Sequence, residues 1–527
     1  MTGDPAGTAV VIGGGVAGLA TAALLARDGY HVDLLEQQDV LGGRAGSWDC
    51  DGFRFDTGPS WYLMPDVFEH FFSLFGTTAR EQLDLTVLDP GYRVFFEGVE
   101  QPVDIRADRA TNVATFESIE AGAGEQLERY LASADDAYEI AVRRFLYSNF
   151  DAVSSQLRWD VVVRTPRLLR LLTQSLEGFV ADRFEDRRLA QILGYPAVFL
   201  GTSPDRAPSM YHLMSRLDLS ERVLYPAGGF VRLVESLAGL ARGAGARLHT
   251  GTTVTGLTTR RRPGRRTRSA VTGVRYRDSQ GVEGTLPADV VVGAADLHHL
   301  ETELLPDSQQ SYPADYWADR DPGPGAVLAC LGVRGQLPQL LHHSLFFTSD
   351  WRQNFDAIFG DRPAVPVPAS VYVCKPSATD PTVAPAGSEN LFVLVPVPAD
   401  VSLGRGGVSG AGDPLVEAVA DAAIDQVAAW ADVPDLRSRI VVRRTYGPAD
   451  FADTFNAWSG GALGPAHTMR QSAFLRTGNV SKKVAGLYYA GASTVPGIGL
   501  PMCLISAELV LKRLRGDRSS EPLDESA

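Results

Sequence analysis

The sequence predicts an α/β protein of two or more domains, and three observations support this prediction. An apolar strand, a glycine-rich turn, a helix and a second apolar strand follow one another over residues 8–36. Residues 126–219 have mostly helical patterns, whereas residues 326–397 contain four β-rich runs separated by loops rich in Pro, Gly and Asp. The chain has 527 residues, 45% of them hydrophobic, so it can bury more than one large core.

The turn after the first strand has the spacing of a dinucleotide-binding fingerprint. Gly13 permits a tight turn, Gly15 lets backbone amides approach a pyrophosphate, and Gly18 lets the helix pack closely against the sheet. The free N–H groups at the start of this helix favour a negatively charged ligand. Glu36 ends the second strand, at a distance from Gly13 where a carboxylate accepts hydrogen bonds from ribose hydroxyls. These residues predict a dinucleotide cofactor.

A second glycine turn follows the second strand. Gly43 permits an unusual backbone path, and Arg44 directly after it can reach a phosphate of the bound dinucleotide. An ordinary structural turn is the alternative, but a cation close behind a pyrophosphate loop favours the phosphate contact. The alternation over residues 52–56 then predicts a short strand that carries Gly58 toward the same ligand.

The last predicted strand ends in a glycine- and proline-rich stretch, residues 491–501. Gly491 and Ala492 allow close backbone approach, and the turn through Gly499 leads into a helix that has Met502 in its first turn. The start of this helix directs a second set of free amides at a negative group. A reduced flavin ring carries negative charge around N1 and C2=O, so we expect the ring at this helix end.

Composition excludes several classes of partner. The net charge of −14 argues against nucleic acid as a general partner. The four cysteines lie far apart without a CxxC pair, so neither a metal site nor a disulfide framework is expected.

Residues 8–26 carry no charge and superficially resemble a signal peptide, but the dinucleotide-binding fingerprint explains why they are apolar. We therefore expect a cytoplasmic protein in a reducing compartment.

One segment stands out in this acidic chain. Between Arg143 and Leu172 there are six arginines against two aspartates, interleaved with aromatic and aliphatic residues. A solvated helix face is the simplest interpretation. A basic, aromatic-rich helix is also what binds anionic lipid headgroups, so this segment is the candidate for contact with an anionic membrane surface.

Taken together, the motifs resemble those of the bacterial phytoene desaturase (carotenoid desaturase) family of FAD-dependent enzymes, within the flavin amine oxidase superfamily. The resemblance covers nearly the whole chain and is greatest to actinobacterial members. Three further motifs contribute to it: Asp56-x-Gly58-Pro59, Tyr225-Pro226-x-Gly228-Gly229 and Ala294-Ala295-Asp296. The run Thr494-x-Pro496-Gly497-x-Gly499-x-Pro501 is the part typical of carotenoid enzymes. Ser493 departs from the family, where Gly is frequent.

The resemblance implies a Rossmann-like FAD-binding domain of the glutathione-reductase type, made of residues 1–105, 222–298 and 480–515. It implies a helical, membrane-contacting portion over 106–221 and an α+β substrate domain over 299–479. The polar residues 516–527 are expected to form a disordered tail. The residues implied to bind FAD are Gly13, Gly15, Gly18, Glu36, Gly43, Arg44, Gly58, Gly491, Ala492, Gly499 and Met502.

The implied activity is desaturation of phytoene toward neurosporene or lycopene by hydride transfer to the flavin, with oxygen or a quinone as terminal acceptor. The enzyme would take its substrate at the inner face of the cell membrane. The acceptor of the substrate's proton stays open between a carboxylate, water and the flavin, and we interpret His298-His299 and His342-His343 as loop or interface residues.

Other functions remain as alternatives. The same fold and cofactor serve carotenoid ketolases, isomerases and downstream desaturases, and flavin amine oxidases, some of which attach the flavin to a cysteine. A prenyl-lipid escort protein without redox chemistry is an alternative from another class, against which the intact phosphate glycines, Glu36 and Arg44 argue.

Overall fold

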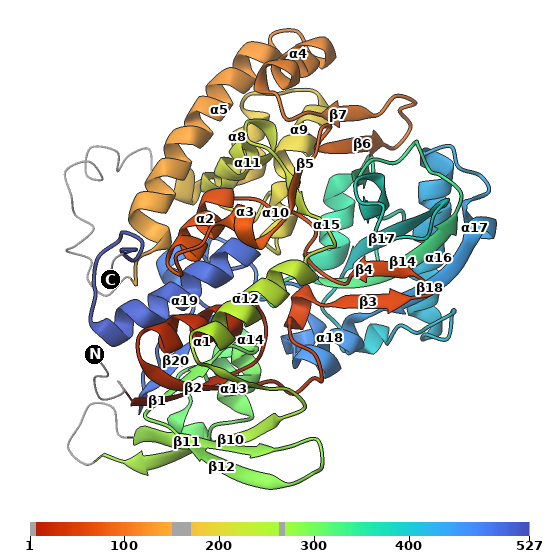
Figure 1. The fold of residues 1–527 in the computed structure, drawn as a ribbon. Coiled ribbons are helices and arrows are strands. Elements are labelled where there is room, and N and C mark those ends of the chain that lie inside the picture. Colours follow the sequence, from red (N-terminus) through yellow and green to blue (C-terminus); the bar gives the residue numbers. More distant parts are fainter. Residues whose placement is uncertain (1–6, 150–169, 263–268, 526–527) are drawn as a thin grey trace.

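The structure, a computed structural model, describes residues 7–149, 170–262 and 269–525 (Figure 1). Its first layer is a five-stranded parallel sheet. In spatial order its strands are β20 (Leu487–Tyr489), β13 (Val290–Gly293), β1 (Gly7–Ile12), β2 (Tyr30–Leu35) and β9 (Arg247–His249). Both faces of a parallel sheet are covered, which is why β1 and β13 contain the buried apolar runs Ala9–Ile12 and Val290–Val292. Three stretches of chain far apart in sequence thus form one sheet, and the predicted α/β class is confirmed.

Three helices cover one face of this sheet. They are α1 (Val16–Arg27), α12 (Val231–Gly243) and α19 (Leu500–Arg515), and α1 lies between the other two (Figure 1). Eleven of the twelve residues of α1 are buried, all but the terminal Arg27, which explains why the helix carries no charge before that residue.

A smaller sheet covers the opposite face. It consists of β10 (Thr253–Arg261), β11 (Ser269–Arg277), β12 (Glu283–Pro287) and β19 (Val484–Ala485). Val274 of this sheet belongs to the same hydrophobic cluster as Val10 and Val291 of the parallel sheet. The two sheets therefore pack face to face.

The second large unit contains a seven-stranded, mainly antiparallel sheet. Its order is β18 (Ile440–Tyr446), β14 (Gly325–Arg334), β17 (Ser388–Val397), β16 (Val371–Cys374), β15 (His343–Phe347), β6 (Tyr92–Phe96) and β7 (Val103–Ile105). Helix α16 (Pro414–Trp430) covers one face, where Val419 and Ile424 join the cluster formed by Val327 and Val393.

The sequence-based boundary of the cofactor domain at residue 105 is wrong in this respect. Strands β6 and β7 belong to the seven-stranded sheet, because β6 pairs in parallel with β15, with Val94 opposite Leu345. Pairing between residues so distant in sequence leaves no local pattern, so the sequence alone could not place this strand pair.

Helices fill the space beside β6 and β7. They are α4 (Arg109–Ile119), α5 (Ala123–Ile140) with a π-helical turn over Ala141–Leu146, α8 (Leu176–Ala181), α9 (Arg187–Gly194), α10 (Pro196–Phe199) and α11 (Met214–Leu219). The remaining elements connect the units: β3 (Ser47–Cys50), β4 (Phe53–Asp56), α2 (Pro65–Ser73), α3 (Ala79–Gln82), β5 (Leu85–Val87), β8 (Leu224–Pro226), α13 (Leu297–Thr302), α14 (Ala314–Ala318), α15 (Trp351–Phe359), α17 (Leu436–Arg439) and α18 (Pro448–Phe455).

The C-terminal residues correct a second expectation. Residues 516–525, predicted to form a disordered tail, pack against α19. The buried Lys512 ammonium donates to the carbonyl oxygens of Ser519 and Glu521 at 2.8 and 2.7 Å, and the amide of the buried Leu523 donates to Glu508 Oε2 at 3.1 Å. The sequence looks polar here because backbone carbonyls, rather than apolar side chains, make most of these contacts.

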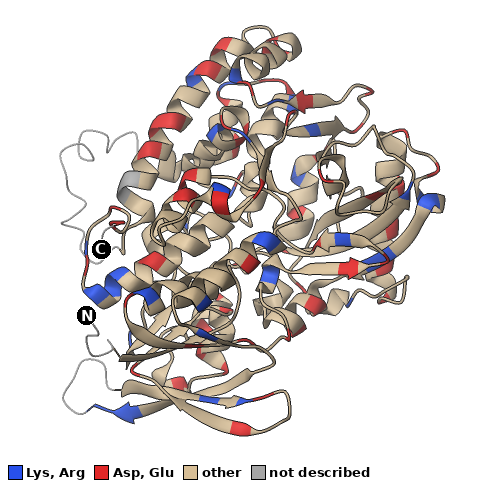
Figure 2. Ribbon diagram, viewed as in Figure 1, with Lys and Arg blue, Asp and Glu red and all other residues tan. Residues whose placement is uncertain are grey.

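Most of the basic segment lies outside the described residues, which resume at Arg170. Figure 2 shows acidic and basic residues interspersed over the described ribbon. Lys512, Arg513 and Arg515 all belong to the last turn of α19. In the described ranges, every helix is too short or too polar to cross a bilayer.

Candidate cofactor-binding site

A cleft opens at the carboxyl ends of the parallel strands around β1. It encloses about 1070 Å³ of empty space, the solvent at its mouth included. Beside the turn from β1 to α1, its walls come from residues 42–45, 294–296, 454–456 and 490–493. Open parallel sheets bind ligands at such strand ends.

The first glycine turn forms the floor of this cleft. Gly13 has φ +103°, and a Cβ there would lie 3.1 Å from the backbone of Ala294. Gly15 is the N-cap of α1, so the first amides of the helix face the cleft without a capping side chain of their own. Gly18 lies behind the cleft, where a Cβ would come within 1.9 Å of the Gly13 carbonyl oxygen. Its role is close packing of α1 on the strand end.

Glu36 lines the cleft at the end of β2 and is 6% exposed. Its Oε2 accepts from the Gly14 amide at 2.6 Å, and its Oε1 accepts from the Gln38 amide at 2.8 Å. The carboxylate therefore fixes the glycine turn, and each oxygen keeps a further lone pair for a hydroxyl donor in the cleft.

Arg44 is brought to the cleft by the second glycine turn. The Gly42 amide donates to the Gly14 carbonyl oxygen at 2.9 Å, and a Cβ on Gly43 would lie 3.3 Å from the Cα of Gly15. The two glycine turns thus touch, and Arg44 emerges beside the helix N-terminus.

Two buried nitrogens of the Arg44 guanidinium make no hydrogen bond within the described residues. Its buried Nε and Nη2 bond to no group in the described part of the chain, and the nearest carboxylate oxygen, Asp296 Oδ2, is 3.8 Å from Nη2. Burial lowers the pKa of Arg44, although Asp296 opposes this shift. A buried guanidinium without bonded partners, beside the free amides of α1, fits an anion with several oxygens, such as a pyrophosphate.

Gly58 lies beneath the turn that carries Arg44 and lets the backbone of this turn pack closely. A Cβ there would lie 1.9 Å from the carbonyl oxygen of Arg44, so the backbone of the Arg44 turn passes directly over Gly58. Asp56 accepts from the Phe230 amide at 2.9 Å, which ties this strand to the 228–230 turn, and burial raises the pKa of Asp56 to about 7.

The opposite wall is the turn between β20 and α19. Gly491 and Ala492 line the cleft, and Gly491 has φ +109°. Gly499, with φ +123°, is the N-cap of α19. Gly499 and Met502 flank the helix start, while Leu500 and Cys503 provide its cleft-facing side chains.

The sequence did not identify three residues that support this site, either beside Arg44 or behind the 491–499 turn. Asp296 appeared only within a motif, yet it pairs with Arg44 and caps α13 by accepting from the His298 amide at 3.0 Å. Arg476 and His467 lie behind the 491–499 turn. Arg476 and His467 lie in loops outside any recognisable motif, so the sequence alone gave no reason to select them.

Three of the four paired histidines lie in helices or strands, and His342 lies in a bend directly before a strand. His298 and His299 belong to α13, and His299 lines the cleft. His343 begins β15, where Trp61 stacks on its ring at 4.2 Å, and His342 directly precedes it. Burial lowers the pKa of His342 to about 3 and that of His343 well below its usual value, so both rings are neutral.

Comparisons with known proteins show which sequences and folds this chain is similar to. Residues 16–510 match the family described as flavin-containing amine oxidoreductase. The chain is 41% identical to the carotenoid 3,4-desaturase of Haloarcula japonica, over 96% of this chain and 98% of that protein. It is 34% identical to the zeta-carotene-forming phytoene desaturase of Myxococcus xanthus, over 96% and 93% of the two chains. The crystal structure of an oxidoreductase from Methanosarcina mazei has the same fold, with a TM-score of 0.62 at 16% identity, over 96% of this chain and 100% of that chain.

Proposed function

The chain belongs to the flavin-containing amine oxidoreductase family, and from this premise we propose that it is an FAD-dependent carotenoid desaturase. FAD is its cofactor. The two relatives named above desaturate carotenoids, in agreement with the resemblance found in the motifs. The observation that carries the proposal is the cleft, in which two glycine turns and the start of a helix surround the guanidinium of Arg44, whose buried Nε and Nη2 form no hydrogen bond within the described residues.

In this proposal the cleft residues hold FAD in an extended form. The amides around Gly15 and the Arg44 guanidinium bind the pyrophosphate, Glu36 accepts from the ribose, and the Gly491–Ala492 turn with the start of α19 contacts the ring. Gly13, Gly18, Gly43, Gly58, Gly499 and Met502 shape the turns that carry these groups. The cofactor domain is then of the glutathione-reductase type.

The bound flavin supplies a hydride acceptor, which a hydrocarbon without polar groups requires. After a hydride leaves one carbon of the substrate, a neighbouring carbon loses a proton and the double bond forms. The protein contributes orientation and exclusion of water. Trp61, two positions beyond the cleft residue Pro59, packs against Tyr92, Tyr195 and Phe199.

The substrate we propose is phytoene, with oxygen or a quinone as terminal acceptor, and a later carotenoid is the second candidate. The relative from Myxococcus xanthus favours phytoene, whereas the more similar one from Haloarcula japonica is named for a 3,4-desaturation. Expression of the protein in a host that makes phytoene, and in a host that makes a coloured carotenoid, distinguishes the two substrates. Chromatography should reveal a longer conjugated polyene in one host, and the double variant Glu36→Ala, Arg44→Ala is the negative control. Unchanged pigments in both hosts, with FAD bound to the protein, would refute desaturation.

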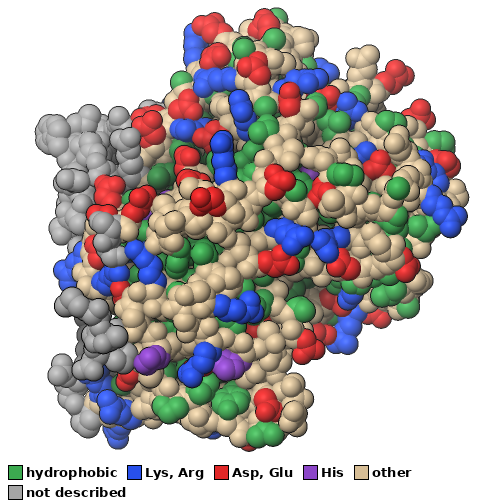
Figure 3. Space-filling view, viewed as in Figure 1, with side chains coloured by type: hydrophobic (Ala, Val, Ile, Leu, Met, Phe, Trp, Pro, Cys, Tyr) green, Lys and Arg blue, Asp and Glu red, His purple; other side chains and the backbone are tan. Residues whose placement is uncertain are grey.

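We further propose that the enzyme is cytoplasmic and lies on the inner face of the membrane, because its substrate dissolves in lipid. The basic segment from Arg143 to Leu172 is one candidate contact. An apolar loop is the other: Met469, Phe474 and Leu475 are all exposed. The described face in Figure 3 carries mixed charges rather than one continuous basic region, so a local contact of this kind is required.

A further inference from the structure

A buried arginine lies directly behind the turn that forms one wall of the cleft. Arg476 is 7% exposed. Its Nη2 donates to the carbonyl oxygens of Ala492 and Pro465 at 2.6 and 3.0 Å, and its Nε donates to that of Thr494 at 3.2 Å. Since Ala492 lines the cleft, the guanidinium is one residue removed from the space where the flavin ring is proposed to lie.

This positive charge has no neutralising carboxylate. Within residues 7–149, 170–262 and 269–525, no Asp or Glu oxygen lies within 4.0 Å of Arg476, and all its hydrogen-bond acceptors are backbone carbonyls. Burial lowers the pKa of Arg476 to about 10, so the side chain still carries its charge at neutral pH.

The titratable groups that face Arg476 are uncharged. They are His467, Tyr211 and Tyr316. Burial and the Arg476 charge hold the pKa of His467 well below its usual value. The ring Nε2 accepts from the Ile498 amide at 3.2 Å, so the proton is on Nδ1 and is donated to the Tyr211 hydroxyl at 2.7 Å. His467 therefore supports the same turn without adding or cancelling charge.

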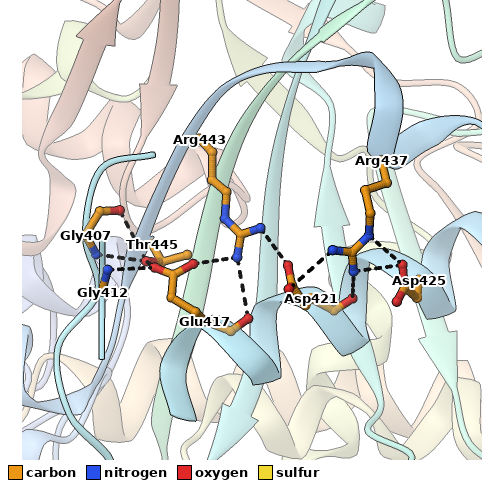
Figure 4. A network of polar contacts seen from close by, with 8 residues as sticks. All are labelled: Gly407, Gly412, Glu417, Asp421, Asp425, Arg437, Arg443 and Thr445. Atoms are coloured by element: carbon orange, nitrogen blue, oxygen red, sulfur yellow. Dashed lines mark hydrogen bonds and ion pairs between the residues drawn. The ribbon is translucent and has the colours of Figure 1, made fainter. Parts of the chain in front are cut away.

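A second arginine of this protein, which is partly buried, has its charge neutralised by carboxylates. Arg443 lies between Glu417 and Asp421 and donates to Asp421 Oδ1 at 2.6 Å (Figure 4). Thr445 and the Gly412 amide complete the bonds of Glu417. Taking an arginine out of water without such partners is costly, so the buried charge of Arg476, which no carboxylate of the described residues neutralises, favours an anion nearby.

We propose that Arg476 is a positioning residue for the redox reaction: it holds the 492–494 turn and stabilises the negative charge of the reduced flavin. The inference rests on the proposed function. Two electrons and one proton pass from a substrate C–H bond to the flavin as hydride, the second proton leaves the neighbouring substrate carbon for water, and the ring keeps one negative charge around N1 and C2=O. Arg476 and the start of α19 place positive charge at the wall of the cleft where the ring is proposed to lie.

The direct test is the midpoint potential of bound FAD in Arg476→Gln, measured without any carotenoid. Losing the charge should lower the preference for reduced over oxidised flavin at least about tenfold, which is about 30 mV for a two-electron couple. Arg476→Lys should retain most of the wild-type potential. Arg443→Gln is the matched control, because it removes an arginine whose charge is already neutralised. A wild-type potential in Arg476→Gln with FAD bound would overturn the proposal.

The wild-type protein offers a second readout in case Arg476→Gln does not fold. If the site stabilises the anionic ring, reduction should take up one proton per two electrons even in mildly acidic buffer. Uptake of two protons there would overturn the proposal. Both measurements use chemical reduction, so they stand apart from the pigment experiment: a wild type inactive on carotenoids would refute the proposed substrate without changing the potential.

Discussion

Arg44 is the single side chain on which cofactor affinity should depend most directly, because its Nε and Nη2 bond to no described group. Removing charge-assisted hydrogen bonds costs about 1.5–3 kcal/mol, so Arg44→Ala should weaken FAD binding roughly 10- to 100-fold. Glu36→Ala should have a similar effect and should also leave the Gly14 amide without its acceptor. Titration of the apoprotein with FAD measures both. Arg232→Ala, which removes an exposed arginine paired with Glu235, is the control. Loss of activity at unchanged FAD affinity would mean that both residues have other roles.

Cys503 is the residue that would allow a covalent link to the flavin. It lines the cleft in the first turn of α19, where some flavin amine oxidases attach their cofactor to a cysteine, but burial raises the pKa of its thiol to about 11. A protonated thiol is a poor nucleophile, so we expect FAD to be bound without a covalent link. Acid precipitation should release the yellow chromophore into the supernatant, and Cys503→Ser should bind FAD as the wild type does. Flavin retained on the precipitated chain would contradict this expectation.

At the scale of elements, the start of α1 depends on Gly18. A Cβ at this position would lie 1.9 Å from the Gly13 carbonyl oxygen, so Gly18→Ala must push the helix away from the strand end. Such overpacking costs about 1–3 kcal/mol and displaces the amides that face the cleft. We expect a lower free energy of unfolding and weaker FAD binding. Gly239→Ala on the exposed face of α12 is the control: nothing lies within 4 Å of its Cβ, and it should stabilise the helix by about 0.5–1 kcal/mol. Equal effects of the two variants would be inconsistent with this account.

Asp218 joins the helical layer to β6 and gives the fold a pH dependence. Its Oδ2 accepts from the hydroxyls of Tyr92 and Tyr195 at 2.9 and 2.6 Å, yet burial raises the pKa of its carboxyl from 3.8 to about 7. The folded state therefore holds a proton that the unfolded state releases, and stability falls as the pH rises from about 4 through 7.

Asp218→Asn should remove this effect. At 1.36 kcal/mol per pKa unit, the gain in the free energy of unfolding above pH 7 is on the order of 4 kcal/mol, and it should vanish near pH 4. Urea denaturation of both proteins at several pH values measures the difference. Parallel pH profiles would show that Asp218 is ionised in the folded state throughout.

For the whole molecule, the prediction concerns the membrane. Arg164, Arg167 and Arg170 fall in the basic segment, and Arg170 is exposed, 3.4 Å from Asp182. At about 1 kcal/mol for each arginine near an anionic surface, replacing all three with Gln should substantially reduce flotation with anionic liposomes and leave FAD bound. High salt should have the same effect, because the Debye length is about 8 Å at physiological ionic strength.

Two further variants sharpen the liposome experiment. Replacing the exposed Arg232, Arg277 and Arg352 with Gln changes the net charge equally and should not affect flotation. Phe474→Ser with Leu475→Ser tests the apolar loop, whose two side chains are 64% and 48% exposed. If the basic variant floats as the wild type does on anionic and neutral lipid, the basic segment is not the contact.

How much the sequence could predict depends on how far apart along the chain the interacting residues lie. The turn from Gly13 to Gly18 and its partner Glu36 form one contiguous unit, so spacing alone located that half of the cleft. Strands β6 and β7 could not be assigned, since their partner β15 lies far along the chain. Arg476 acts through backbone carbonyls, which any sequence provides, so only the folded structure identifies its place.

The parallel sheet draws its strands from residues 7–35, 247–293 and 487–489, and this order matters during synthesis. Strand β1 emerges from the ribosome early, but its neighbour β13 comes much later and the cleft wall at Gly491 almost last. At about 5–20 residues per second, the nascent chain must protect one edge of β1 from aggregation until β13 is made, since β2 can pair only with the other edge. The cleft that takes the flavin is therefore incomplete until the turn at Gly491 has been synthesised.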